Sequence, residues 1–541
     1  MPESKKQNFV KGSAILTAGI LIARILGAGY RIPLGNILDT AGLGALHVAH
    51  TVFVLILTLT TAGVPIAMSR KVSSANTAGK TGLVKRYFNV TLPAFIILGV
   101  VAMVAMFVFA DSLAQIMRNS LAAPGIRILA PAVFFACIVS VYRGYAQGLE
   151  YMTPTAMSQV LEAVAKLISG VALAWVIVGR GFTMQYAAAG ANAGVTVGLL
   201  VCVPLLILYK RKVDRTLPSV SATESLPARG AALQQILRIS APIMLGASLM
   251  ALVTTVDLIV VQSRLQFAVG LTESQASSYV GLFAMAQTIA NLPQSFVVAI
   301  SASIIPAIAA SITDGKGGTA KNIMQSAIKF VNIIIMPASV GVMVMSRPIM
   351  SALYGLYGDA WNTASTILTI FGVAAFFVCL QLITTAILQA NGYERIPMFT
   401  LPIGGALQIG INYVLSGNPS IGVISLPIGL LAGHATISLL NIGFIISKVK
   451  NRPNFGGVFI KPLLCTIVMG VAAYSVYGLL NRFASPVLGT GRLSTIIYLT
   501  ATIAVSALVY GVLIIVSRTI TRDDLRLLPK GERLADILRV K

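Results

Sequence analysis

Two arginines interrupt the first hydrophobic segment of the chain, which reads "ILIARILGAGYRIPLGNIL" over residues 20–38. Arg24 and Arg31 are seven residues apart, so in a helix they share one face at a separation of about 10 Å. An arginine at the centre of a spanning helix costs about 2.5–3.5 kcal/mol. Because guanidinium groups bind phosphate bidentately, the pair predicts a binding site for a phosphate or pyrophosphate. In the alternative, Arg24 pairs with Asp257 and Arg31 extends to the surface.

A few other polar residues fall within apolar runs and extend this candidate site. Glu162 precedes Lys166 by four residues, the spacing of a helix ion pair, so we expect Glu162 to neutralise Lys166. Together with Asp257 and Gln287, these two are candidate cavity or coupling residues. Asp257 and Asn412 offer oxygen ligands for a hard cation. The expected coupling ion is therefore Na+ or H+, with no resident cofactor, no catalytic residue and no bound metal cluster.

The composition places these residues in a membrane. Hydrophobic residues make up 56% of the 541 and charged residues only 10%, against about 25% charged in soluble domains. The mean hydropathy is +0.87. The four cysteines lie in apolar runs, without the spacing of a disulfide framework or a zinc site. These features predict an all-α polytopic membrane protein.

Apolar stretches long enough to span a bilayer, about 20 residues each, define the expected helices. There are fourteen of them. They cover residues 12–34, 43–69, 87–110, 126–147, 154–179, 185–209, 236–263, 278–311, 322–346, 362–390, 396–415, 421–447, 458–480 and 494–517. The first is read as an uncleaved span, because no small-residue cleavage site follows it.

The formal net charge of +24 is explained mainly by topology. Basic residues concentrate in alternate loops, such as "KKQNFVK" and "YKRKVDRTLPSVSATESLPARG", and in the tail from Arg518. Loops rich in lysine and arginine stay in the cytoplasm. We therefore expect both termini to be cytoplasmic. Anionic lipid headgroups are expected partners and nucleic acid is not.

An internal repeat divides the chain. "QGLEY" at 147–151 and "QANGY" at 389–393 end the fourth and tenth spans at an offset of 242 residues. Six spans per half make the repeat parallel, with a central cavity between two six-helix lobes and alternating access as the expected mechanism. The predicted regions are an N-terminal lobe (1–210), a cytoplasmic linker (211–235), a C-terminal lobe (236–450), two extra helices, the thirteenth and fourteenth (451–517), and a basic tail (518–541).

Two longer runs carry a family resemblance. "TAGVPIAMSRKV" at 61–72 and "RGYAQGLEYMTPTAMSQVLEAVAKL" at 143–167 resemble the stage V sporulation protein B/YtgP group. This group belongs to the polysaccharide transporter branch of the multidrug/oligosaccharidyl-lipid/polysaccharide exporter superfamily, and the likeness covers nearly the whole chain. The length of this chain is similar to that of the MurJ-like lipid II flippases.

The resemblance implies two lobes around a cationic cavity, with the last two helices forming a lipid-facing groove. It also implies translocation of lipid II, the undecaprenyl-pyrophosphate-linked peptidoglycan precursor, with cell-wall synthesis machinery as a further partner. "ARILGAGYR" matches the arginine motif of the first helix at Arg24, while Tyr30 stands at the second matching position, next to Arg31. Where the family has an arginine in the eighth helix, this chain has Gln287.

The sequence leaves several functions open, and a secondary transporter is the leading one. No GxxxxGK[ST] motif indicates ATP hydrolysis, so membrane potential or an ion gradient is the expected driving force. A flippase for another undecaprenyl-linked polysaccharide, such as a teichuronic or capsular unit, is an alternative. A drug/cation antiporter would need surplus acidic residues in its cavity. A membrane glycosyltransferase would need carboxylates in a large outer loop, and the predicted outer loops are short.

Overall fold

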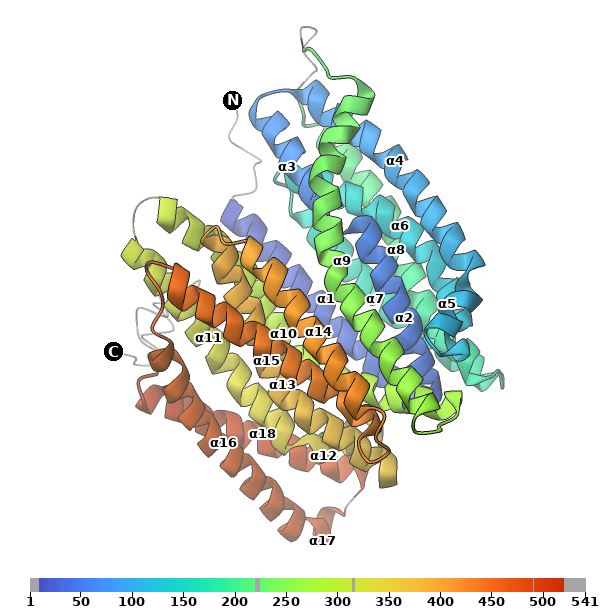
Figure 1. Cartoon of the computed structure of the whole chain (residues 1–541), viewed down its shortest axis with the longest axis vertical. Coiled ribbons are helices and arrows are strands. Elements are labelled where there is room, and N and C mark those ends of the chain that lie inside the picture. Colours follow the sequence, from blue (N-terminus) through green and yellow to red (C-terminus); the bar gives the residue numbers. More distant parts are fainter. Residues whose placement is uncertain (1–8, 219–223, 314–316, 490, 520–541) are drawn as a thin grey trace. The chain divides into compact units, whose positions relative to one another are not determined.

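The computed structural model describes residues 9–218, 224–313, 317–489 and 491–519. All regular secondary structure in these residues is helical (Figure 1). The chain divides into two compact units. Unit 1 consists of residues 1–284 and 412–423, and unit 2 consists of residues 285–411 and 424–541.

The helices follow the chain in the order of the predicted spans. The elements up to the unit boundary are α1 (Phe9–Ile37), α2 (Thr40–Thr61), α3 (Val64–Thr77), α4 (Thr81–Val108), α5 (Ala110–Ile116), η1 (Ser120–Ala122), α6 (Ala123–Gly148), α7 (Thr153–Gly179), α8 (Met184–Asp214), α9 (Arg229–Phe267) and α10 (Glu273–Thr313), which runs across it. The later elements are α11 (Gly317–Val344), α12 (Ser346–Tyr354), α13 (Gly358–Ala390), α14 (Arg395–Leu415), η2 (Gly422–Ile424), α15 (Ser425–Lys448), α16 (Phe455–Phe483), α17 (Ser485–Leu488) and α18 (Arg492–Val516).

Each of the fourteen predicted spans falls on helix, which confirms the all-α polytopic fold. Over the described residues, thirteen helical segments are long and apolar enough to cross a membrane. The range predicted for the eighth span lies in α10. The first helix continues through Pro33 without a break. The compact units do not coincide with the predicted lobes, because α9 and the start of α10 belong to unit 1. Most of the predicted tail lies outside the described residues.

One helix forms the centre of each unit. In α6, 72% of the most apolar window is buried, and in α13 the figure is 61%, the two highest values among these helices. They are the fourth and tenth spans of the predicted repeat. The turns that follow them also match: Tyr151 N donates to Ala146 O, and Tyr393 N donates to Leu388 O, both at 2.9 Å. The shared offset of 242 residues supports the predicted duplication.

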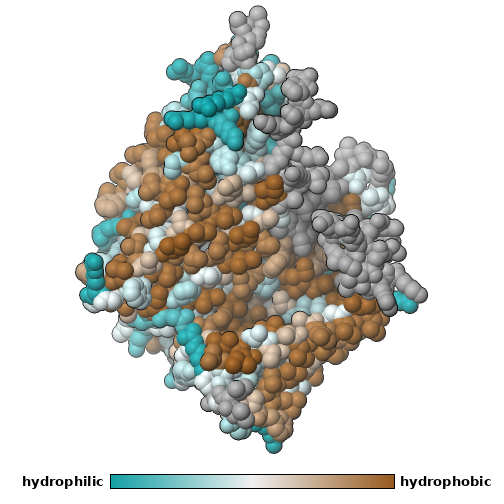
Figure 2. Space-filling view, turned by 180° about the vertical axis from the view of Figure 1, so that it is seen from behind, coloured by the Kyte–Doolittle hydropathy of each residue, from teal (hydrophilic) through white to brown (hydrophobic). Residues whose placement is uncertain are grey.

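The outer face of α4 shows how these helices meet a bilayer. Val101, Val104 and Val108 are 60%, 50% and 63% exposed, and Ile97, on the same face, is 65% exposed. Soluble proteins seldom expose so continuous an apolar surface. Figure 2 shows hydrophobic residues over much of one face, with hydrophilic residues gathered mainly at its upper end and toward its lower left.

A close backbone contact joins two helices at one end of unit 1, the end that the basic-loop rule assigns to the outside. Asp39 caps α2 by accepting a hydrogen bond from Gly42 N at 2.6 Å. Beyond the cap, α2 and α10 cross so closely that a Cβ on Gly44 would lie 1.9 Å from Ser277 O. A Cβ on Gly281 would lie 1.9 Å from Thr40 O. Only glycine fits at these two crossings, which we call the glycine seam.

In unit 2, the last two spanning helices pack on α11 and α12. Tyr510 of α18 donates its hydroxyl to Ile333 O of α11 at 2.9 Å. At the start of the same helix, the Arg492 guanidinium donates to Ala352 O at 2.9 Å and to Leu353 O at 2.6 Å, at the end of α12. These contacts hold α18 beside the two earlier helices.

Candidate substrate site

A charged pocket opens among α2, α6, α7 and α8 of unit 1, within their membrane-spanning segments. Its volume is about 400 Å³. Its polar lining includes His50, Arg143, Glu162 and Lys166, and the remainder is largely apolar, as with Phe53. Charged groups inside spanning helices face a cavity or a partner. The pocket is therefore the candidate ligand site of unit 1.

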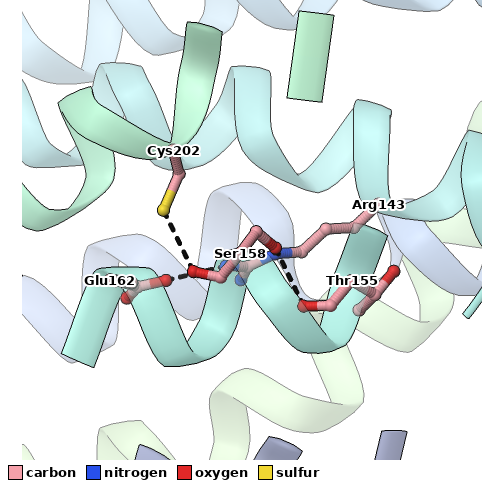
Figure 3. A network of polar contacts seen from close by, with 5 residues as sticks. All are labelled: Arg143, Thr155, Ser158, Glu162 and Cys202. Atoms are coloured by element: carbon pink, nitrogen blue, oxygen red, sulfur yellow. Dashed lines mark hydrogen bonds and ion pairs between the residues drawn. The ribbon is translucent and has the colours of Figure 1, made fainter. Parts of the chain in front are cut away.

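Arg143 of α6 joins Glu162 and Ser158 of α7 into one network (Figure 3). Its Nη2 donates to Glu162 Oε2 at 2.8 Å, and its Nε donates to Ser158 Oγ at 2.9 Å. The two charged side chains are 16% and 28% exposed. Ser158 Oγ donates in turn to Thr155 O, and Cys202 of α8 donates its thiol to Ser158 O. Each polar group named here is satisfied by protein, which fixes the guanidinium in place.

Lys166 has a different environment from the one predicted. Its ammonium nitrogen lies 4.6 Å from the centroid of the Tyr30 ring, a cation–π contact. Among the described residues it forms no hydrogen bond or ion pair. The predicted Glu162–Lys166 pair is therefore wrong, because Arg143 takes the carboxylate. Lys166 consequently lines the pocket with its three N–H groups available.

Glycines bring the supporting helices close enough to hold this arrangement. A Cβ on Gly194 of α8 would lie 2.7 Å from Lys166 O, and one on Gly198 would lie 2.7 Å from Glu162 O. Tyr30 is 3% exposed, and its hydroxyl donates to Ala191 O of α8 at 2.7 Å. The aromatic ring beneath Lys166 is therefore anchored to the same helix pair.

The structure brings some of the predicted residues together and separates others. Arg31 is half-buried on α1 and is not among the residues that line the charged pocket. Arg24 is exposed and makes no ion pair within the described part of the chain, so the alternative Arg24–Asp257 pair is absent there. Gln287 lies in unit 2 and is half-buried.

Asp257 and Asn412 meet inside unit 1 as the sequence suggested. Asn412 Nδ2 donates to Asp257 Oδ1 at 2.6 Å, and the residues are 0% and 4% exposed respectively. Asn412 Oδ1 is buried and accepts no hydrogen bond from the described residues. A buried carboxylate beside an unsatisfied amide oxygen is a suitable donor set for a hard cation. The binding of such an ion stays a prediction.

Arg143 is the member of the pocket that the sequence analysis missed. It lies near the end of the predicted fourth span, where a basic residue is usually interpreted as part of the adjoining cytoplasmic loop. Its partner Glu162 is on another helix, so no spacing within either helix relates them. The available signal was the presence of both residues in the run at 143–167.

Unit 2 contains an apolar groove of about 500 Å³ between α10, α11, α16 and α18. Pro337 and Gly341 of α11 line it together with Met469 of α16 and Gly511 of α18. The shape and lining of the groove suit a hydrocarbon chain. The last two spanning helices form one side of it.

Comparison with known proteins supplies the family. The model of the family described as "Polysaccharide biosynthesis protein" matches residues 9–311. Stage V sporulation protein B of Bacillus subtilis (strain 168) is 27% identical over 538 residues, which are 98% of this chain and 99% of that protein. Lipid II flippase MurJ of the same organism is 24% identical over 519 residues, covering 93% and 94% of the two chains.

Solved structures share the fold. An inward closed conformation of lipid II flippase MurJ aligns with a TM-score of 0.66 at 14% identity, covering 92% of this chain and 98% of that one. An inward-facing multidrug resistance MATE family transporter of the MOP superfamily aligns with a TM-score of 0.65 at 17% identity, covering 81% and 98%. These matches confirm the resemblance drawn from residues 61–72 and 143–167, and the chain is a multi-pass membrane protein.

Proposed function

Because the chain belongs to the polysaccharide biosynthesis protein family, in the polysaccharide transporter branch of its superfamily, we propose that it is a flippase for lipid II. It would carry the undecaprenyl-pyrophosphate-linked peptidoglycan precursor from the inner to the outer leaflet of the bacterial plasma membrane by alternating access. The observation that carries the proposal is the charged pocket, in which the Lys166 ammonium has no hydrogen-bond partner among the described residues.

The chemistry of the pocket suits a pyrophosphate. Arg143 is held and neutralised by Glu162, so the net positive charge of the pocket lining comes from Lys166. Lys166 can donate to phosphate oxygens, and Arg31 adds charge from α1. Arg24 lies about two turns before Arg31 on the same face of α1 and would meet the anion as it enters. Arg24 and Arg31 would give the anion a basic path along α1, and Lys166 would bind it in the pocket.

The apolar groove of unit 2 suits the other part of the ligand. A polyprenyl tail needs a hydrocarbon surface, and the groove between α11, α16 and α18 offers one. Outward movement of an anion is favoured by an inside-negative membrane potential, by about 2.3 kcal/mol per charge per 100 mV. Asp257 and Asn412 are the proposed site for Na+ or H+ if an ion gradient contributes.

Another undecaprenyl-linked polysaccharide is the second candidate substrate. The similarity to stage V sporulation protein B is slightly higher than the similarity to MurJ, and the pocket residues would bind any pyrophosphate-linked glycan. A drug/cation antiporter fits the pocket less well, because its charged lining is mainly basic.

Complementation tests the proposal. The chain is expressed in a bacterium depleted of its own lipid II flippase, beside Lys166→Gln and an Arg24→Ala/Arg31→Ala double variant, at matched membrane levels. We expect the native chain to restore growth and both variants to fail. Failure of the native chain to restore growth at full expression would reject lipid II in favour of another lipid-linked glycan.

A further inference from the structure

A second basic hollow of unit 1 lies away from the charged pocket, between the first turns of α4 and α9. Its volume is about 700 Å³. Lys85 and Arg86 of α4 and Arg229 of α9 bring three positive charges to its lining. It shares no lining residue with the charged pocket. We call it the basic pocket.

The three cations of the basic pocket have no anionic partner in the part of the chain that the structure describes. Within the described residues, none of them forms an ion pair or a hydrogen bond. Lys85 and Arg86 are half-buried and Arg229 is exposed. The neighbouring carboxylate, Glu224, is already used: it accepts from Gly82 N at 2.8 Å and Leu83 N at 2.7 Å.

Glu224 therefore occupies the N-terminus of α4, where backbone N–H groups and the helix dipole favour an anion. It satisfies the helix end and leaves the side-chain cations facing the hollow. The three cations are therefore available to an external anion.

Apart from Asn89, the rest of the lining is largely apolar. Pro93, Ala94 and Ile97 continue the pocket along α4. Ile97 begins the exposed apolar face that runs on through Val101 to Val108. A ligand that fills the pocket therefore meets positive charge at one end and a lipid-facing hydrocarbon surface at the other.

We propose that the basic pocket binds an anionic glycerophospholipid, with its phosphate between Lys85, Arg86 and Arg229 and its acyl chains along α4. Basic pockets between spanning helices on the cytoplasmic side attract anionic headgroups, and the basic-loop rule assigns this end of unit 1 to the cytoplasm. Free phosphate would gain from the three charges but not from the apolar half. The inference rests on the membrane-spanning fold and not on the proposed substrate.

Native mass spectrometry of the full chain in a neutral detergent tests this assignment. Phosphatidylglycerol and phosphatidylcholine are titrated against the native protein and a Lys85→Gln/Arg86→Gln/Arg229→Gln variant. We expect the variant to lose at least tenfold in phosphatidylglycerol affinity, with phosphatidylcholine binding unchanged. The control, Arg211→Gln/Lys212→Gln/Arg215→Gln, removes the same charge near the end of α8, outside the pocket, and should keep native affinity.

A second variant distinguishes binding at this site from a general effect of lost charge and from a folding defect. Ala94→Trp fills the apolar half and leaves all three cations, so it should also weaken phosphatidylglycerol binding. Native affinity in both pocket variants, or equal loss in the control, would overturn the proposal. Competition by millimolar inorganic phosphate alone would assign the pocket to a soluble anion instead. Lipid binding is measured without transport, so its failure is distinct from failure of the flippase proposal.

Discussion

The Lys166 ammonium lies 4.6 Å from the centre of the Tyr30 ring, while Arg143 holds the carboxylate of Glu162 at 2.8 Å. The two cations of the charged pocket therefore have different roles. Arg143 is fixed by protein, and Lys166 rests on an aromatic face with its donors available to a ligand. The first two predictions separate these roles.

Replacing Lys166 by glutamine should weaken ligand binding with little effect on stability. A hydrogen bond to a charged group contributes about 1.5–3 kcal/mol, which corresponds to about 10- to 150-fold in affinity. Lys166→Arg should restore part of the binding because it keeps the charge. Binding of a polyprenyl pyrophosphate to purified protein measures both effects. Lys212→Gln, on the exposed end of α8, is the matched control, and equal losses in the two variants would contradict the role given to Lys166.

Replacing Arg143 by glutamine should lower thermal stability, because Glu162 is then left unpaired in a half-buried place. The expected cost is about 1–3 kcal/mol. Adding Glu162→Gln should recover part of it, since the orphaned carboxylate is removed. Melting curves of the two single variants and the double variant in detergent give the coupling. If the stability losses of the two single variants add up to the loss of the double variant, the ion pair does not stabilise the pocket.

Adding a side chain at the glycine seam should separate α2 from α10 and expose the residues between them. Gly44→Val or Gly281→Val places a Cβ only 1.9 Å from a backbone carbonyl oxygen of the opposite helix. A cysteine at position 277, introduced as Ser277→Cys, should then react faster with a membrane-impermeant thiol reagent added from outside. Gly246→Val is the control, because a Cβ there meets no neighbouring atom. Unchanged thiol reactivity in both seam variants would show that this contact does not shield position 277 from the reagent.

Filling the groove of unit 2 should impair transport without changing headgroup binding. Gly341→Leu/Gly511→Leu adds bulk at two groove positions where a Cβ meets no neighbouring atom. Flipping of lipid-linked substrate in proteoliposomes should fall severalfold, while affinity for a short-chain pyrophosphate stays native. Gly478→Leu, equally unobstructed on α16 but outside the groove, should leave both unchanged. Loss of headgroup affinity in the groove variant would contradict a role limited to the tail.

Asp257→Asn should abolish any stabilisation of the protein by Na+. The carboxylate contributes the formal charge of the proposed cation site, and Asn412 contributes an oxygen. Melting temperature measured in NaCl and in choline chloride at equal ionic strength gives the effect. A sodium-dependent shift that survives in Asp257→Asn would place the ion elsewhere, and equal melting temperatures of the native protein in the two salts would leave H+ as the coupling ion to test.

The sequence predicted the helices well, because a spanning helix needs a long apolar run and such runs are visible in one dimension. It predicted that Glu162 and Lys166 belong to the site, since charge within a span is costly. It did not predict their partners. Arg143 reaches Glu162 from another helix, and Tyr30 lies beneath Lys166 because α1 packs on α7 and α8. Spacing within one helix carries no information about such contacts.

The division into units was less visible from the sequence. The repeat indicated two lobes of six helices, yet α9 and the start of α10 pack with unit 1. The glycine seam accounts for part of this difference, since it joins α2 to α10 by backbone contact. A single glycine in an apolar run does not reveal which helix will lie against it.

The turns after α6 and α13 share one backbone conformation but differ in the residue that adopts it. Glu150 stands at a φ of 65° where the second copy has Gly392 at 81°. A side chain in this left-handed conformation costs about 1–2 kcal/mol relative to glycine, yet the hydrogen bonds of the two turns are the same. The two turns therefore keep one backbone path although only the second has glycine at the left-handed position, so Glu150→Gly should raise the stability of unit 1 without altering the turn.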